Sequence, residues 1–155
     1  MAFVKPSSVA GSGEFLKGAE HVNDVAILFE PKSIRKDVKH KHNNVEKVRD
    51  ELKADVTFFR TMADLQDGKP SKVAKGMVIT YGMVIGTLEA ALPGTPDGGE
   101  AGGQVVGVLR KIPTANGSGY VIRDAEEEVF DAVVEYYDRR EGAIAEAVAD
   151  APDFD

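Results

Sequence analysis

Residues 104–140 contain the clearest indication of the fold and begin with an apolar run, Gln104-Val-Val-Gly-Val-Leu-Arg-Lys-Ile112. A turn-rich break follows, Pro113-Thr-Ala-Asn-Gly-Ser-Gly119, and then a short second run, Tyr120-Val-Ile-Arg123. The Asn-Gly step inside the break suits a tight reversal, because both residues tolerate positive φ. The stretch therefore predicts two strands joined as a hairpin.

A helix is expected to follow this hairpin directly, beginning at Asp124. The Asp124 side chain can cap the helix, and Glu127, three residues on, completes a capping box. Four apolar residues then recur at helical spacing and predict one buried face: Val129, Phe130, Val133 and Tyr137. A hairpin that leads into an amphipathic helix is typical of the closing half of a small β-barrel or a small α+β domain.

Three further strands are predicted upstream, over residues 24–31, 53–61 and 75–88. Residues 34–42 fit helix and strand spacing equally well, and residues 46–54 form either a loop or the first part of a long strand. The glycines inside the third strand indicate bends or bulges, as at barrel corners: Gly76, Gly82 and Gly86.

These elements predict a mainly β domain with a C-terminal α-helix. No long helix separates the strands, so few parallel crossovers can form, and an antiparallel five-stranded OB-fold barrel is the economical arrangement. Residues 1–13 are rich in Ser, Gly and Pro and are expected to form a flexible arm. Residues 14–141 would form the OB-fold domain with its helix, and residues 142–155 an acidic tail.

Composition places the chain among soluble globular proteins of one domain, with 155 residues, 43% hydrophobic and 29% charged. The absence of cysteine excludes disulfides, thiolate metal sites and thiol nucleophiles. The first residues lack the apolar run of a secretion signal, and no stretch approaches the roughly 20 apolar residues of a membrane helix. We therefore expect a cytoplasmic protein that does not contact a membrane.

The net charge of −7 is distributed unevenly along the chain. Residues 124–155 hold 12 acidic and 2 basic residues, whereas residues 1–123 hold 17 Lys and Arg against 14 Asp and Glu. The acid is thus concentrated at the C-terminal end, and the body is mildly basic. Such asymmetry indicates separate surfaces for separate partners, although the acidic end is equally typical of a solubilising helix face and tail.

No motif of a known catalytic class is present: the sequence has no phosphate-binding G-x-x-x-x-G-K-[ST], no G-x-S-x-G and no H-E-x-x-H. On a strand, His40 and His42 would share a face and could hold a metal, but no cysteine or carboxylate cluster accompanies them. Exposed histidines on a basic surface are the favoured interpretation. The run Glu126-Glu-Glu128 imitates paired catalytic carboxylates, yet at a helix N-terminus it more simply complements the dipole. We expect no enzymatic activity, metal or cofactor.

The remaining pattern is one of binding. Single-stranded nucleic acid is held by basic grooves that follow the phosphates and by aromatic faces that stack on bases. Lys and Arg occur beside aromatic residues on the predicted strands, for example Arg60 beside Phe59 and Arg123 near Tyr120. Phe58 and Phe59 point to opposite faces of their strand, so we expect one in the core and the other partly exposed. For every aromatic residue here, burial in the core is the alternative.

Several motifs occur in an order that resembles a known group of proteins. An early strand ends at Pro31, Ala54-Asp-Val56 lies in a second strand, and a third is rich in glycine and β-branched residues. Val105-Val-Gly-Val-Leu109 and Gly119-Tyr-Val-Ile-Arg-Asp124 then lead into an acidic helix. Over most of residues 15–137 this order is similar to the small OB-fold proteins of actinobacterial phages labelled single-stranded-DNA-binding, or SSB-like. Many of those proteins carry Trp where Tyr120 stands here.

The C-terminus, Ala149-Asp-Ala-Pro-Asp-Phe-Asp155, is similar to the acidic tip through which single-stranded-DNA-binding proteins recruit replication and repair partners. Phe154 is followed by Asp155 here, so the order differs from the usual tip. The resemblance implies that the tail contacts replication or recombination proteins through four residues: Asp150, Asp153, Phe154 and Asp155.

Two functions are carried forward from the sequence. The first is a non-enzymatic OB-fold protein that coats single-stranded DNA in phage replication or recombination, with the oligomeric state left open. Its candidate phosphate contacts are Lys32, Arg35, Lys36, Lys39, Lys41, Arg60, Arg110, Lys111 and Arg123, and its candidate stacking residues are Phe59, Tyr81 and Tyr120. The second is a structural or protein-interaction module, such as a virion or assembly component, on the same barrel.

Overall fold

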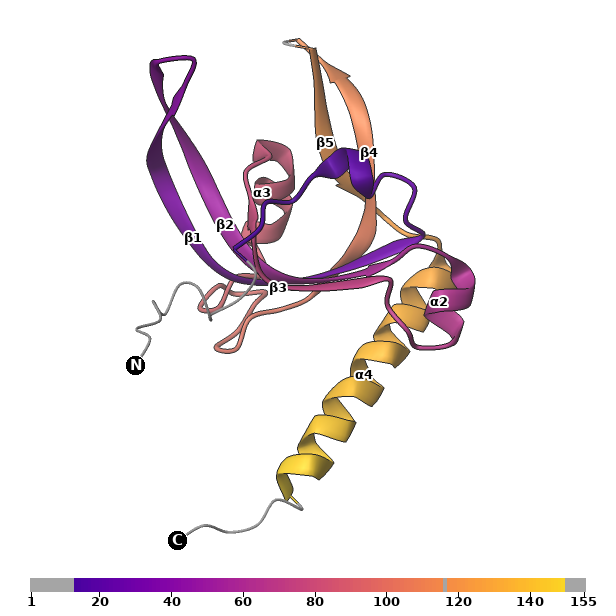
Figure 1. The fold of residues 1–155 in the computed structure, drawn as a ribbon. Coiled ribbons are helices and arrows are strands. Elements are labelled where there is room, and N and C mark those ends of the chain that lie inside the picture. Colours follow the sequence, from indigo (N-terminus) through magenta and orange to yellow (C-terminus); the bar gives the residue numbers. More distant parts are fainter. Residues whose placement is uncertain (1–12, 116, 150–155) are drawn as a thin grey trace, which may run out of the picture.

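The computed structural model describes residues 13–115 and 117–149 (Figure 1). Five strands form one curled half-barrel in the order β3-β2-β1-β4-β5, and every neighbouring pair is antiparallel. The strands are β1 (Ala26–His42), β2 (Val45–Phe59), β3 (Lys72–Ile79), β4 (Val105–Thr114) and β5 (Gly117–Arg123). The helical elements are η1 (Gly18–Glu20), α2 (Met62–Gln66), α3 (Gly82–Glu89) and α4 (Glu127–Ala149). The predicted fold class, mainly β with a C-terminal helix, is confirmed, and the arrangement is consistent with an OB-like fold.

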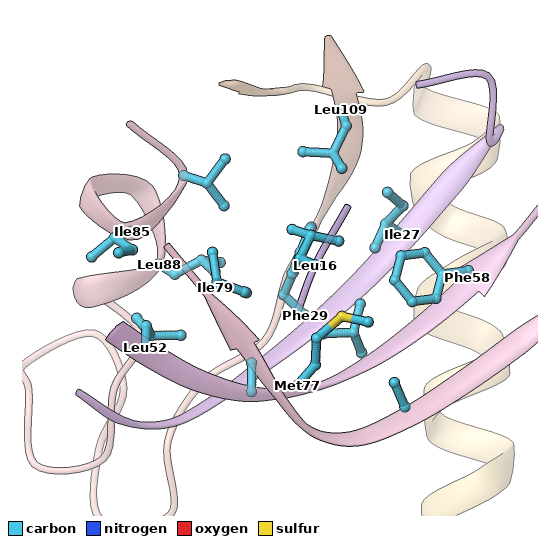
Figure 2. Close-up of a cluster of buried hydrophobic side chains, with 14 of the residues drawn as sticks. Leu16, Ile27, Phe29, Leu52, Phe58, Met77, Ile79, Ile85, Leu88 and Leu109 are labelled. Atoms are coloured by element: carbon cyan, nitrogen blue, oxygen red, sulfur yellow. The ribbon is translucent and has the colours of Figure 1, made fainter. Parts of the chain in front are cut away.

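The half-barrel buries side chains on both of its faces. Successive side chains of a strand point to opposite faces, and in β2 Phe58 enters the inner core while Phe59 enters the outer one. Figure 2 shows the inner core, in which Phe29, Phe58 and Leu109 come together from three strands. The outer core lies between the sheet and the first turns of α4. The sheet therefore needs the helix, because without it Phe59 would face water.

Both long strands continue past the barrel into a hairpin. The ambiguous residues 34–42 are strand, and residues 46–54 are the first part of a long strand, as one of the two predicted alternatives had it. The pairing of β1 with β2 extends to His42 and Val45, where Asn43 and Asn44 turn the chain with positive φ. Asparagine tolerates this left-handed conformation, which a two-residue hairpin turn of this kind requires.

The prediction of one strand over residues 75–88 is wrong in its second half. Strand β3 ends at Ile79, and α3 begins at Gly82. Val84, Ile85 and Leu88 are buried at helical spacing, while Gly82 and Gly86 lie on the exposed side of the same helix. These two glycines are therefore not barrel bends. The short helix α2, which Thr61 caps by accepting a hydrogen bond from Asp64 N, was also not predicted.

The C-terminal helix differs from its prediction at both ends. It begins at Glu127, so the capping box expected at Asp124 is not where the helix starts. It continues to Ala149, so residues 142–149, predicted as tail, are helical. Val129 and Val133 are buried as predicted, but Phe130 is 44% exposed. No helix within the described ranges is long and apolar enough to cross a membrane.

A segment of residues 14–24, here called the closing segment, lies across the open side of the half-barrel. Leu16 N donates to Val78 O (2.9 Å) and Val78 N donates to Glu14 O (2.8 Å), which adds a short parallel pairing to the edge of β3. Farther along, Gly18 packs against the ring of Tyr120 in β5, and Arg110 of β4 donates to Val22 O. The segment thus joins the two strands that the sheet order leaves at its edges.

We predict that Phe59→Ala destabilises the fold by about 3–5 kcal/mol, because it opens a cavity between the sheet and α4. Phe130→Ala in α4 is the matched control and should cost clearly less than Phe59→Ala, since Phe130 is 44% exposed whereas Phe59 is fully buried. Urea unfolding monitored by circular dichroism measures both. Equal effects of the two substitutions would contradict the outer core described above.

Candidate nucleic-acid interface

The interface is built on two hairpin arms that project from the same side of the half-barrel (Figure 1). The first arm comprises residues 35–50 of β1 and β2, and the second comprises residues 110–121 of β4 and β5. Helix α3 lies between the bases of the arms and contacts β1, β2 and β5. In OB folds, oligonucleotides bind to the equivalent first and last hairpin loops and to the face of strands 2 and 3.

The first arm carries three predicted cations on the face that continues the barrel interior. Lys39 pairs in register with Val48 and Lys41 with Glu46, positions that alternate with buried Leu52 and therefore share its face. Lys36 Nζ lies 2.7 Å from Glu89 Oε1 of α3 and 3.5 Å from Asp50 Oδ2. The hydrogen bond to Glu89 raises the pKa of Lys36 above its ordinary value.

The second arm contributes Lys111 to the same inner face. Lys111 pairs in register with Tyr120, two positions beyond the pair Leu109 and Ile122, which reaches the inner core. Lys111 and Lys41 are exposed, and neither has an ion-pair partner among residues 13–115 and 117–149. On this inner face, each arm therefore offers an ammonium group that can meet a phosphate.

The two tyrosines predicted to stack on bases lie together at the base of the arms. The ring centroids of Tyr81 and Tyr120 are 4.7 Å apart, and the planes are inclined at 48°. Both rings are partly buried. Tyr81 Oη accepts a hydrogen bond from Gly18 N (2.9 Å), and a Cβ added at Gly18 would lie 2.6 Å from the Tyr120 ring. The closing segment therefore covers part of both rings and leaves the rest accessible.

Acidic side chains interrupt this basic surface. Glu89 and Asp50 face Lys36, and Glu46 Oε1 lies 3.8 Å from Lys39 Nζ. These pairs are exposed, so each contributes little to stability. A phosphate that approached Lys36 or Lys39 would have to compete with a carboxylate already in place.

Other predicted contacts lie elsewhere. Lys32 is on the outer face, with Nζ 3.9 Å from Asp55 Oδ2, and Arg35 pairs in register with Glu51 on that face as well. Arg110 and Arg123 alternate with the inner residues of the second arm and also point outward. They cannot join the inner face, because a strand presents only alternate residues to one side.

The prediction that Phe59 stacks on bases is wrong. Its side chain is fully buried in the outer core, where its ring meets that of Tyr136 edge to face at 5.1 Å. The expectation that one of Phe58 and Phe59 is partly exposed is also wrong, since α4 covers the face that would otherwise be open. The proposed partner residues Asp150, Asp153, Phe154 and Asp155 lie outside the described residues.

Arg60 is exposed and lies beside two buried polar residues, His21 and Asp24, at the end of the sheet away from the arms. His21 Nδ1 lies 2.8 Å from Asp24 Oδ2, and Arg60 Nε forms an ion pair with Asp24 Oδ1. The His21 ring stacks on Phe58 with centroids 3.8 Å apart. The contact of His21 with Asp24 was not predicted, although their spacing of three residues was the available signal. This group of residues fastens the end of the closing segment to β2.

The described residues contain no group of three or more His, Cys, Asp or Glu that could hold a metal ion. Comparison of the chain with models of protein families, with curated proteins and with solved structures found no match.

We predict opposite effects for two glycine-to-alanine substitutions. Gly18→Ala should destabilise the protein by about 1–3 kcal/mol, because its methyl group would collide with the Tyr120 ring. Gly86→Ala should stabilise it by about 0.5–1 kcal/mol, since its methyl group meets nothing within 4 Å on an exposed helix position. Urea unfolding gives both values, and the near-UV signal of the tyrosines should change only for Gly18→Ala. Retention of full stability by Gly18→Ala would refute the packing of the closing segment.

Proposed function

We propose that this protein binds and coats single-stranded DNA without catalysis. The observation that carries the proposal is that Tyr81, Tyr120 and Lys111 lie on the same inner face as the lysines of the first arm, on one side of an OB-like half-barrel. Partly exposed rings on a basic surface are the combination by which OB folds hold single-stranded nucleic acid regardless of sequence.

The binding step in this proposal is an exchange of partners. Phosphates along the strand displace Glu46, Asp50 and Glu89 from the lysines of the first arm, and Lys41 and Lys111 take further phosphates directly. Cations condensed on the strand are released as the ammonium groups replace them. Bases then lie against the accessible parts of the two tyrosine rings. Affinity should therefore be modest and strongly dependent on salt.

The acidic helix fits the same proposal as a surface that a nucleic acid avoids. Helix α4 packs on the outer face, away from the arms, and contains seven acidic and two basic residues. The bound DNA and helix α4 would thus occupy opposite sides of the protein. By the resemblance to phage SSB-like proteins, the proposed setting is DNA replication or recombination in the host cytoplasm, with the C-terminal residues contacting other replication proteins.

A structural or protein-interaction module, such as a virion or assembly component, is the second candidate. It is favoured by the exposed apolar side chains Val45 and Val48 on the first arm, 54% and 58% exposed, and by the carboxylates among its lysines. Such side chains are typical of protein contacts. Failure to retain labelled oligo-dT in a gel shift at low salt would favour this candidate.

We predict that oligo-dT quenches the tyrosine emission of the variant Tyr136→Phe/Tyr137→Phe. The chain has no Trp and four Tyr, so only Tyr81 and Tyr120 emit in this variant, and stacked bases should quench them. The phenylalanines keep the packing of α4. Binding seen by gel shift without any quenching would exclude the two rings from the interface and leave only phosphate contacts.

The role of the lysines is tested by the salt dependence of oligo-dT binding. We expect Lys41→Gln/Lys111→Gln to reduce the slope of log affinity against log salt by about 1.4, because each lost contact to a single strand removes about 0.7. Lys53→Gln/Lys69→Gln is the matched control, with the same loss of charge at exposed positions off the inner face, and should keep the wild-type slope. An equal change in both variants would place the contacts elsewhere.

A further inference from the structure

Helix α4 leaves an apolar groove on the outer face of the protein. Phe130 and Val134, 44% and 39% exposed, form one wall of the groove, while Leu28 and Val106 of the sheet line the other. Its volume is about 280 Å³, enough for one or two branched aliphatic side chains. The groove is not part of the proposed nucleic-acid interface.

The helix side of this groove is acidic. Asp138 lines it, and Asp131 and Glu127 follow at helical spacing on the same side of α4. The helix as a whole contains seven acidic residues and two arginines. Of those arginines, Arg140 is held by Glu30 at 2.9 Å, and Arg139 lies 3.5 Å from Glu135. A partner for the groove therefore has to bring both apolar and cationic groups.

The tip of the first arm has this chemistry. Val45 and Val48 are more than half exposed, and six Lys or Arg against three Asp or Glu occur in residues 35–50. Lys41 and Lys47 near the tip are exposed, and neither has an ion pair among the residues that the structure describes. A valine at the end of a narrow hairpin can enter a groove that a flat surface could not reach.

We infer that the first arm of one copy docks into the α4 groove of a second copy. Val48 and Lys41 share one face of the hairpin, and Val45 and Lys47 share the other. Whichever face docks, its valine would fill the apolar floor and its lysine would approach Asp131 and Asp138. Pairing of two α4 helices is disfavoured, because it would bring two strongly acidic surfaces together. The basic arm with its exposed valines thus complements the acidic, apolar groove. Two arms would repel each other, and so would two grooves.

The geometry makes this association head-to-tail. The first arm and α4 extend in opposite directions from the half-barrel (Figure 1), so one copy cannot fill its own groove. Each added copy leaves one arm and one groove free, which produces chains of increasing length. This inference concerns the protein alone and does not rest on the proposed binding of DNA.

The test uses two complementary variants of the full chain and sedimentation-velocity ultracentrifugation at low salt. The arm variant is Lys41→Glu/Lys47→Glu, and the groove variant is Asp131→Lys/Asp138→Lys. The wild type should associate in a concentration-dependent way that raised salt reverses, since screening shortens from about 30 Å at 0.01 M to about 10 Å at 0.1 M. Each variant alone should self-associate at least tenfold more weakly than the wild type.

A mixture of the two variants gives a sharper result, because each retains the surface that the other lacks. The reversed arm of one variant also faces the reversed groove of the other with opposite charge, so mixing should restore association. Lys53→Glu/Lys69→Glu and Asp97→Lys/Glu100→Lys are matched controls with the same charge changes at exposed positions outside both surfaces, and should associate as the wild type does. Circular dichroism of every variant verifies the fold.

Three results would overturn the inference. The first is a wild type that remains monomeric at every concentration at low salt. The second is a closed dimer insensitive to salt, which would indicate a symmetric apolar interface. The third is a mixture of the arm and groove variants that associates no better than either variant alone. None of these results depends on whether the protein retains oligo-dT.

Discussion

The structure depends on the burial of two consecutive phenylalanines in β2. Phe58 and Phe59 point to opposite faces of one strand, and both are fully removed from solvent. Each burial contributes roughly 1.5–3 kcal/mol, which can be gained only if both faces of the sheet are covered. Curling of the sheet covers Phe58, and docking of α4 covers Phe59. The curl of the half-barrel and the docking of the helix are therefore both needed to bury this pair of residues, and the helix is part of the core.

The same curl explains the closing segment. A half-barrel that ends with β3 on one side and β5 on the other has two edges with unpaired backbone groups, which favour unwanted strand pairing. The closing segment pairs with β3 through Val78 and packs Gly18 against Tyr120 of β5. The buried contact of His21 with Asp24 then fixes its far end. The tyrosines at the base of the arms consequently have a structural role as well as the proposed role in stacking.

Local pattern located each of the five strands but not all of their ends. Strands β1 and β2 extend beyond the predicted residues 24–31 and 53–61, and β3 ends well before residue 88. The Asn-Gly step between two apolar runs in residues 104–123 predicted the second arm, because hairpins form from neighbouring residues. Strand and helix could not be told apart at residues 80–88, where Val84, Ile85 and Leu88 suit either state and tertiary contacts decide. The burial of Phe59 was beyond prediction for the same reason, since the element that covers it lies some 70 residues later in the chain. In the candidate site, Lys39, Lys41 and Lys111 lie on the inner face and Arg110 and Arg123 on the outer face. This assignment follows from the strand register, which the sequence does not show.

The first arm has two proposed partners, and their chemistry is related. A phosphate strand and an acidic helix both offer negative charge to Lys41 and Lys47, but only the helix also offers an apolar groove to Val45 and Val48. If both associations occur, they compete for one set of lysines. Protein without DNA would then form chains, whereas bound single-stranded DNA would occupy the arms and prevent chain formation. The carboxylates Glu46 and Asp50 weaken both interactions by pairing with neighbouring lysines in the unbound state. Because these carboxylates weaken the attraction of the arm for both partners, the arm could release one anionic partner and bind the other.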